Sequence, residues 1–158
     1  MILSLFEWIE KSALGTSVNE SLYAFALIES VHLLALAMLG GAVLIVDMRM
    51  LGLGLKRLPV AQVAKTAQPW LVIGLIAIIA TGFPLFASLA AGKYYVNGAF
   101  WWKMYFLAGA MLYTFTIRQR VAMGDEVRAT SGFGKLVALV SLFLWSGVGV
   151  MGRAIGFI

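Results

Sequence analysis

The sequence predicts an all-α integral membrane protein, built as a four-transmembrane-helix bundle with a short N-terminal interfacial helix. Of its 158 residues, 62% are hydrophobic and only 12% are charged, whereas about a quarter of the residues of a soluble domain carry charge. The apolar residues form long continuous blocks, which is the pattern of helices surrounded by lipid. We expect a single transmembrane domain over residues 1–158.

The N-terminal segment, residues 2–14, is expected to form a short amphipathic helix. Apolar side chains recur there at steps of three and four residues, and Trp8 lies among them. The segment lacks the basic start of a signal peptide and carries Glu7, Glu10 and Lys11. It therefore predicts a helix in the membrane interface or, equally, an ordinary first helix packed on the bundle.

The first span is expected at about residues 21–46. Ser17 and Glu20 have the spacing of a capping box, so a helix should begin there. The apolar block that follows is long enough for a hydrocarbon core of about 30 Å. Asp47 and Arg49 come directly after it, and we expect them to anchor its inner end and to contact the third loop.

Three further spans are expected at about residues 69–91, 100–117 and 135–156. Pro69 suits the first turn of the second span. Pro84 lies inside that span and should kink it, because proline removes one hydrogen bond of the helix. The third span opens with the side chains of an aromatic belt at the headgroup level: Trp101, Trp102 and Tyr105.

Basic residues predict the orientation. Most of the twelve Lys and Arg residues fall after the first and third spans, and the positive-inside rule places those loops in the cytoplasm. Both termini are then periplasmic, in a bacterial inner membrane. The same rule explains the net charge of +5 without a nucleic-acid partner. The cations of these loops are Arg49, Lys56, Arg57, Lys65, Arg118, Arg120, Arg128 and Lys135.

Two ionisable residues, Glu29 and His32, lie inside the first span. Each costs about 3 kcal/mol in a membrane helix, and at three residues apart they share a face. We expect that face to point toward protein. His32, the only histidine, is a candidate axial ligand for the iron of haem b, or a ligand for another transition metal. The alternative is a buried histidine that holds helices together through Glu29 or a backbone carbonyl.

A single histidine limits the haem hypothesis. Two-histidine ligation needs His32 from two protomers of a homo-oligomer; otherwise the iron is five-coordinate or takes a thioether from Met38, Met111 or Met151. Glu29 and His32 also have the Glu-x-x-His spacing of ferritin-like di-iron sites, but the further carboxylates are missing. The absence of cysteine excludes thiolate ligands and disulfides.

Two cations near the outer surface complete the candidate site. Arg153, in the fourth span, is expected at the depth of Glu29, where it would form an ion pair or hold a haem propionate. Lys103, in the third span, would hold a propionate or extend to the lipid headgroups. Gly152 and Gly156 have a small-xxx-small spacing that favours close helix packing and oligomerisation.

Several short motifs resemble an uncharacterised family of small bacterial inner-membrane proteins. They are His32, the Gly40–Gly41 pair, the run Asp47-Met48-Arg49-Met50-Leu51-Gly52, Trp145, and the closing Gly152-Arg153-Ala154-Ile155. The resemblance implies a four-helix fold and a bacterial origin, and no established activity. Such proteins are distantly similar to the membrane part of copper-resistance proteins and to small b-type cytochromes, which carry several histidines where this chain has one.

Three functions remain open. The resemblance favours a b-type cytochrome-like protein that passes electrons to or from a quinone or a redox partner. The second is a cofactor-free structural or accessory subunit. The third is a metal-handling or small transport protein that uses Glu29 and His32. Catalysis is not expected, because no nucleophile–base–acid set is present.

Overall fold

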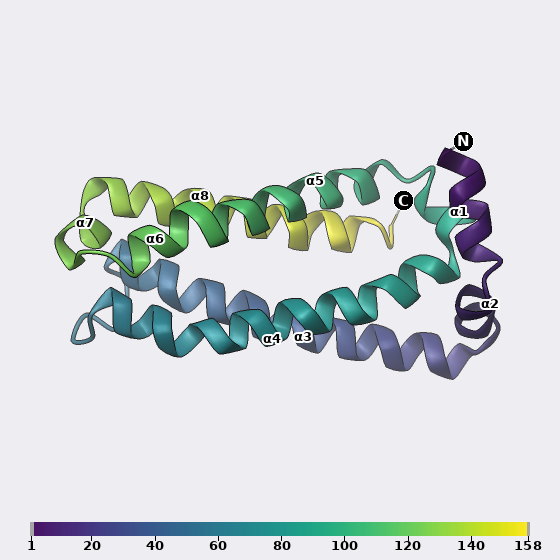
Figure 1. The fold of residues 1–158 in the computed structure, drawn as a ribbon, viewed down its shortest axis with the longest axis horizontal. Helices are drawn as coiled ribbons and strands as arrows, with labels where there is room; N and C mark the ends of the chain where they lie inside the picture. The colour runs from purple at the N-terminus through teal and green to yellow at the C-terminus, as the bar shows by residue number, and fades with distance from the viewer. Residues whose placement is uncertain (1, 158) are drawn as a thin grey trace.

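The computed structural model describes residues 2–157, and every regular element in that range is a helix. The long helices lie side by side, and both termini lie at one end of the molecule (Figure 1). The elements are α1 (Ile2–Glu10), α2 (Ala13–Glu20), α3 (Leu22–Leu51), α4 (Val60–Ser88), η1 (Ala90–Tyr94), α5 (Gly98–Tyr113), η2 (Thr114–Arg118), α6 (Gln119–Ala122), α7 (Glu126–Thr130) and α8 (Gly132–Ala154). The all-α prediction is therefore confirmed.

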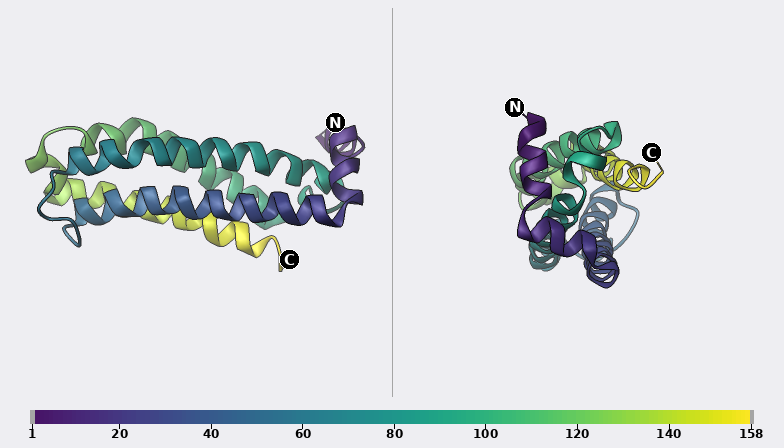
Figure 2. Two further views of the ribbon diagram at one scale, coloured as in Figure 1. Left: turned by 90° about the horizontal axis from the view of Figure 1, so that it is seen from below. Right: turned by 90° about the vertical axis from the view of Figure 1, so that its right-hand side faces the viewer.

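Two short helices, α1 and α2, lie across the end of the bundle that holds the termini (Figure 2). The single helix expected over residues 2–14 is divided, because Ser12 ends one helix and begins the next. The Ser12 hydroxyl donates to the carbonyl of Ile9 at 2.6 Å and accepts from the amide of Gly15 at 3.2 Å. A side-chain oxygen at an N-cap satisfies one of the free amides of the first turn.

The first helix is docked on the bundle through both a charge and an aromatic ring. A carboxylate oxygen of Glu10 accepts from the backbone amides of Ala91 and Gly92, at 2.6 and 3.0 Å. The ring of Phe6 meets that of Phe86 edge-on, with centroids 5.2 Å apart. These contacts tie α1 to the end of α4 and to the π-helical turn η1 that follows it.

The start of α3 differs from the prediction. Ser21 is its N-cap and accepts from the amide of Ala24 at 3.2 Å. Ser17 lies inside α2 instead, where its hydroxyl donates to a backbone carbonyl one turn earlier. The capping box predicted from Ser17 and Glu20 is therefore wrong. Both serines precede the same apolar block, and the chain uses the nearer one.

The helices on either side of the first loop are longer than predicted. α3 continues to Leu51 and ends at Gly52, whose φ of 78° is the left-handed conformation that favours glycine. α4 begins at Val60, so Pro69 lies inside the helix and not in its first turn. The early start has a physical reason, because the first turns of α4 bury an apolar face: Val60, Val63, Ala64 and Ala67.

Three helices of the described chain are long and apolar enough to cross a membrane: Tyr23–Leu51, Val60–Ser88 and Gly132–Ala154. They support the prediction of a membrane protein. The third predicted span changes from α-helix to the π-helical turn η2 near its end, so α5 by itself has only 16 residues. The last helix begins three residues before its predicted start, at Gly132, after the N-cap Ser131.

The best-packed part of the core lies at the end opposite the termini. There α3, α4, α6, α7 and α8 contribute to one apolar cluster, and Met50 and Val60 at its centre are fully buried. At the end that holds the termini, the first turns of α3 are poorly covered, with Tyr23 and Leu27 exposed. The largest buried cluster therefore lies at the end opposite the termini, which we call the inner end because the charge pattern predicts that it faces the cytoplasm.

Candidate functional site

The imidazole of His32 points from α3 toward α4. Its Nδ1 atom lies 2.8 Å from the hydroxyl oxygen of Thr81. That hydroxyl donates to the carbonyl of Ala77 at 2.6 Å. A hydroxyl group has one hydrogen, so when it donates to Ala77 the Thr81 oxygen accepts from Nδ1 of His32, and when it donates to Nδ1 the ring proton lies on Nε2. The first arrangement is the one that leaves a lone pair on Nε2, as a metal ligand requires.

The His32 side chain is half-buried, and the backbone of Ile78 offers its ring a further hydrogen-bond partner. That contact agrees with the alternative of a histidine that holds helices together through a backbone carbonyl. Gly82 leaves room for the ring, because a Cβ atom there would lie 3.2 Å from Cε1 of His32. Histidines that bind metals commonly donate their other ring N–H in this way, which fixes the ring orientation.

The structure does not bring Glu29 to the same place. Its side chain is exposed in the single chain, so within one protomer Glu29 does not share the covered face of His32, and its contact with a second protomer stays a prediction. Residues three apart on an α-helix differ by about 60° around the axis, and α4 covers His32 but not Glu29. Burial raises the pKa of the Tyr94 phenol, and the negative charge of Glu29 raises it further. The Glu29 carboxylate therefore lies within electrostatic range of the segment that connects α4 to α5.

The two cations predicted near the outer surface, Arg153 and Lys103, differ in burial and in their contacts. Arg153 is exposed, and its guanidinium carbon lies 4.9 Å from the ring centroid of Phe157. The predicted ion pair between Arg153 and Glu29 is absent from the ion pairs of the described residues. Phe157 lies four residues after Arg153, so the cation–π contact of this guanidinium is local in the chain.

Lys103 is half-buried and packs against α8. A Cβ atom built at Gly152 would lie 3.6 Å from the Lys103 Nζ atom, so the ammonium group lies directly beside this part of α8. Lys103 also lies within electrostatic range of His32.

A second polar site, which the sequence did not reveal, lies at the inner end of the bundle. Arg118 donates through Nε to Oδ1 of Asp47 at 2.6 Å and through Nη2 to the carbonyl of Val43 at 3.0 Å. Ser141 donates to Oδ2 of Asp47 at 2.6 Å. The side chain of Arg118 is 2% exposed and that of Asp47 is 0% exposed. We call Asp47, Arg118 and Ser141 the inner clamp, which joins α3, η2 and α8.

The inner clamp was missed because Arg118 was assigned to a loop. The predicted third span ended one residue earlier, and a cation just beyond a span is ordinarily exposed. In the structure, Arg118 closes the π-helical turn η2, in which the amide of Gln119 donates to the carbonyl of Thr114. The signal that was present is Asp47, because a carboxylate at the end of a span needs a partner.

A second set of contacts at the inner end confirms part of the prediction for Asp47 and Arg49. Arg49 donates to the carbonyl of Leu58 at 2.7 Å and to a carboxylate oxygen of Glu126 at 2.6 Å. The other oxygen of Glu126 accepts from the amide of Val60 at 2.7 Å. Both residues therefore anchor the inner end of α3, and Arg49 contacts the third loop as expected.

His32 stays a predicted ligand for haem iron or for another metal. No group of three His, Asp or Glu side chains suited to a metal ion is found in the part of the chain that the structure describes. The di-iron interpretation of Glu29 and His32 therefore gains no support.

Comparison with known proteins places the chain in a family. A family model matches residues 5–158, which is nearly the whole sequence. The chain belongs to the family of unknown function DUF6644. No curated protein and no solved structure matches it significantly. Membership of DUF6644 agrees with the resemblance to an uncharacterised family, and it assigns no activity.

Proposed function

We propose that this member of DUF6644 is a membrane b-type cytochrome-like protein that binds haem through Nε2 of His32 and transfers electrons. The observation that carries the proposal is the His32–Thr81 hydrogen bond of 2.8 Å. It supports a ring in which Nδ1 donates to Thr81 and the lone pair of Nε2 remains for a ligand. A neutral imidazole held in this way is suited to an axial position on haem iron.

The residues of one protomer fit haem in part. His32 would supply one ligand, and the half-buried Lys103 would meet a propionate, while the guanidinium of Arg153 packs on the ring of Phe157. A second axial histidine must come from a second protomer, so the proposal includes a homo-oligomer. When bound, haem supplies a one-electron redox couple, and a quinone or a protein redox partner would exchange electrons with it.

We also propose that the bundle crosses a bacterial inner membrane four times. The helical stretch from Gly98 to Ala122 is continuous through η2, and it exceeds the roughly 20 residues that a transmembrane helix needs. Four crossings put both termini on the same side, in agreement with their position at one end of the molecule in Figure 1. The basic loops then face the cytoplasm.

A visible spectrum tests the haem proposal. The protein, expressed with ample haem precursor and purified in mild detergent, should show a Soret band that His32→Ala removes. Thr81→Ser is the matched control, because serine retains the hydroxyl that accepts from Nδ1. A colourless wild-type protein, or a His32→Ala variant with an unchanged haem content, would contradict the proposal.

The cofactor-free accessory subunit is the second candidate, and the inner clamp favours it. Asp47, Arg118 and Ser141 use their polar groups to join helices, which is what a purely structural bundle requires. In that case the protein is colourless, and His32→Ala changes only its stability. Elemental analysis tests the metal-handling alternative, which the exposure of Glu29 away from His32 weakens.

A further inference from the structure

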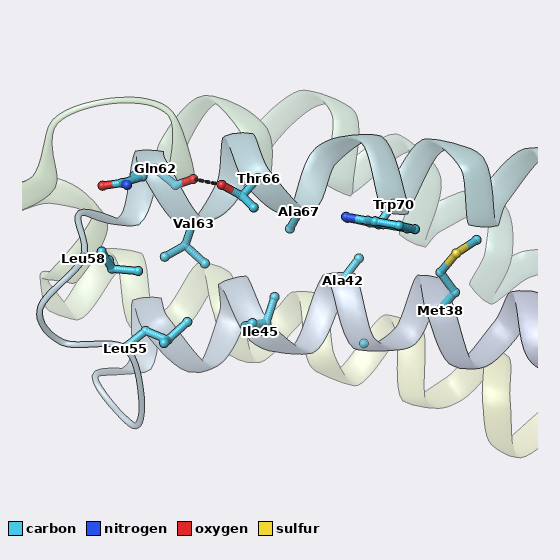
Figure 3. Close-up of a pocket in the computed structure, with 11 residues that line it drawn as sticks. Met38, Ala42, Ile45, Leu55, Leu58, Gln62, Val63, Thr66, Ala67 and Trp70 are labelled. Atoms are coloured by element: carbon cyan, nitrogen blue, oxygen red, sulfur yellow. Dashed lines mark hydrogen bonds between the residues drawn. The ribbon is translucent and has the colours of Figure 1, made fainter.

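An apolar groove of about 450 Å³ runs between α3 and α4 in the inner half of the molecule (Figure 3). Its volume is within the range of about 300–1,000 Å³ found for small-molecule sites. Met38, Ala42 and Ile45 line it from α3, and Gln62, Thr66 and Trp70 line it from α4. The groove lies apart from His32 and plays no part in the proposed haem site.

The polarity of the groove changes along its length. Met38 and Trp70 lie at one end in Figure 3, and Leu55 and Leu58 close the other. The first turns of α4, beside the closed end, expose polar side chains, and an exposed tryptophan follows them at position 70. Beyond Trp70 the exposed side chains of α4 include the apolar Ile73 and Ile76. The groove therefore leads from a polar stretch of α4 toward an apolar one, which suits an amphiphilic molecule.

A fixed turn carries two cations to the closed end of the groove. The amide of Leu58 donates to the carbonyl of Leu55 at 2.9 Å, which leaves Lys56 and Arg57 between them at the exposed tip. Arg49 donates to the carbonyl of Leu58 at 2.7 Å, so the turn is held to α3. The two residues that flank the cations, Leu55 and Leu58, are themselves walls of the groove.

The charge at this end has no protein counterpart within residues 2–157. Lys56, Arg57 and the nearby Lys65 are exposed, and none of them belongs to either ion pair of that range. Three cations beside an apolar groove complement a molecule with an anionic head and an apolar tail. Basic pockets between helices on the cytoplasmic side are a known mode of binding acidic lipid headgroups.

We propose that this groove binds an anionic phospholipid, with an acyl chain along the apolar floor and the phosphate beside Lys56 and Arg57. A second copy of the chain fits less well, because parallel copies packed on this face would bring the same cations close to one another. The proposal does not depend on the haem proposal, and each can fail without the other.

Fluorescence of Trp70 tests the proposal directly. The protein is placed in vesicles that contain equal mole fractions of acyl-brominated lipid, either phosphatidylglycerol or phosphatidylcholine. Brominated phosphatidylglycerol should quench more strongly, and Trp70→Phe should remove that difference. Equal quenching of the wild-type protein by the two lipids would overturn the proposal.

Removing the cations tests the headgroup contact. The double variant Lys56→Gln/Arg57→Gln should lower the preference for phosphatidylglycerol by about fivefold per cation, which corresponds to about 1 kcal/mol each. The matched control is Arg120→Gln/Lys135→Gln, which removes two exposed cations from the same end of the molecule. A preference that survives the first pair, or that the control pair lowers equally, would overturn the proposal.

Filling the groove tests the acyl-chain contact. Gly41 lines the groove, and a Cβ atom there meets nothing within 4 Å, so Gly41→Leu should fold and should reduce quenching of Trp70 by both lipids. Gly149→Leu is the matched control, because Gly149 has equally open space around it in α8. If Gly41→Leu instead converts an oligomer to a monomer, the groove holds a second copy and the lipid proposal is wrong.

Discussion

At the residue scale, Asp47 and Arg118 form the buried ion pair of the described residues. Both charges are withdrawn from water, and the polar atoms of Asp47 are fully committed to Arg118 and Ser141. Such a pair adds little net stability over an apolar replacement, but loss of one partner leaves an uncompensated buried charge. The inner clamp therefore makes the packing of three helices dependent on either charge.

Substitution of Arg118 tests this dependence. Arg118→Met should lower the free energy of unfolding by about 3–5 kcal/mol, because Asp47 is left buried and unpaired. The double variant Asp47→Leu/Arg118→Met should recover most of the loss. Unfolding in mixed micelles measures both. Arg120→Met, at an exposed cation two residues away, should change the free energy of unfolding by less than about 0.5 kcal/mol. A loss at Arg120 equal to that at Arg118 would show that the buried pair with Asp47 is not the cause.

Thr81 offers a second test at the residue scale, and it rests on the haem proposal. Thr81→Val keeps the shape of the side chain but removes the oxygen that accepts from Nδ1 of His32. Loss of such a supporting contact typically weakens metal binding by about 10–100-fold. Titration of the apoprotein with haem should show this weakening for valine and not for serine. Equal affinities for the two variants would show that the hydrogen bond does not orient the ligand.

Single residues also show how far the sequence can predict a site. His32 was identified because an ionisable group inside an apolar helix needs a partner, and the structure supplies Thr81. Glu29 was expected beside it, but whether a face three residues away is covered depends on where α4 lies, which periodicity does not specify. Arg118 was misplaced because a π-helical turn has no sequence pattern that we could use.

At the scale of elements, the helices arise where apolar blocks predict them, whereas their ends depend on local contacts. Two serines, Ser17 and Ser21, precede the block that forms α3. The capping-box motif predicted Ser17 as the N-cap, whereas Ser21 is the N-cap in the structure. The early start of α4 was hidden because Pro69 resembles a first-turn proline, although the turns before it bury an apolar face. Helix existence follows from composition, and helix ends follow from tertiary packing.

The corrected cap gives a prediction with an internal control. Ser21→Ala should destabilise the protein by about 1 kcal/mol, because the amide of Ala24 loses its acceptor. Ser17→Ala should have almost no effect, since that hydroxyl only donates to a carbonyl already bonded within α2. Thermal denaturation followed by circular dichroism compares the two. The reverse order of effects would restore the capping box at Ser17.

At the scale of the whole molecule, the sequence predicted the all-helical class because 62% of its residues are hydrophobic and lie in long blocks. It did not predict which helices pack together. Figure 1 shows α3 beside α4 and α5 beside α8. The inner clamp joins the two pairs through a carboxylate in α3, a guanidinium in η2 and a hydroxyl in α8. Such pairing depends on contacts between residues far apart in the chain.

The proposed four-span topology can be tested by labelling introduced cysteines, because the chain has no cysteine of its own that would react. Ser12→Cys and Phe157→Cys should react with a membrane-impermeant maleimide in intact cells, since both termini are expected outside. Lys56→Cys and Asp125→Cys should react only after the membrane is opened. A chain that crosses three times would place residues 12 and 157 on opposite sides, and only one of them would then react in intact cells.

The wide turn at Thr114–Arg118 has a consequence for tolerated chain length. Deleting one residue from a regular α-helix turns every following side chain by about 100°, which normally ruins a packed membrane helix. A π-helical turn holds one residue more than an α-helical turn of the same height. Loss of the exposed Phe115 would therefore restore ordinary winding and leave α6 facing its present neighbours. The segment that best tolerates a one-residue deletion is therefore the one that ends at the buried Arg118.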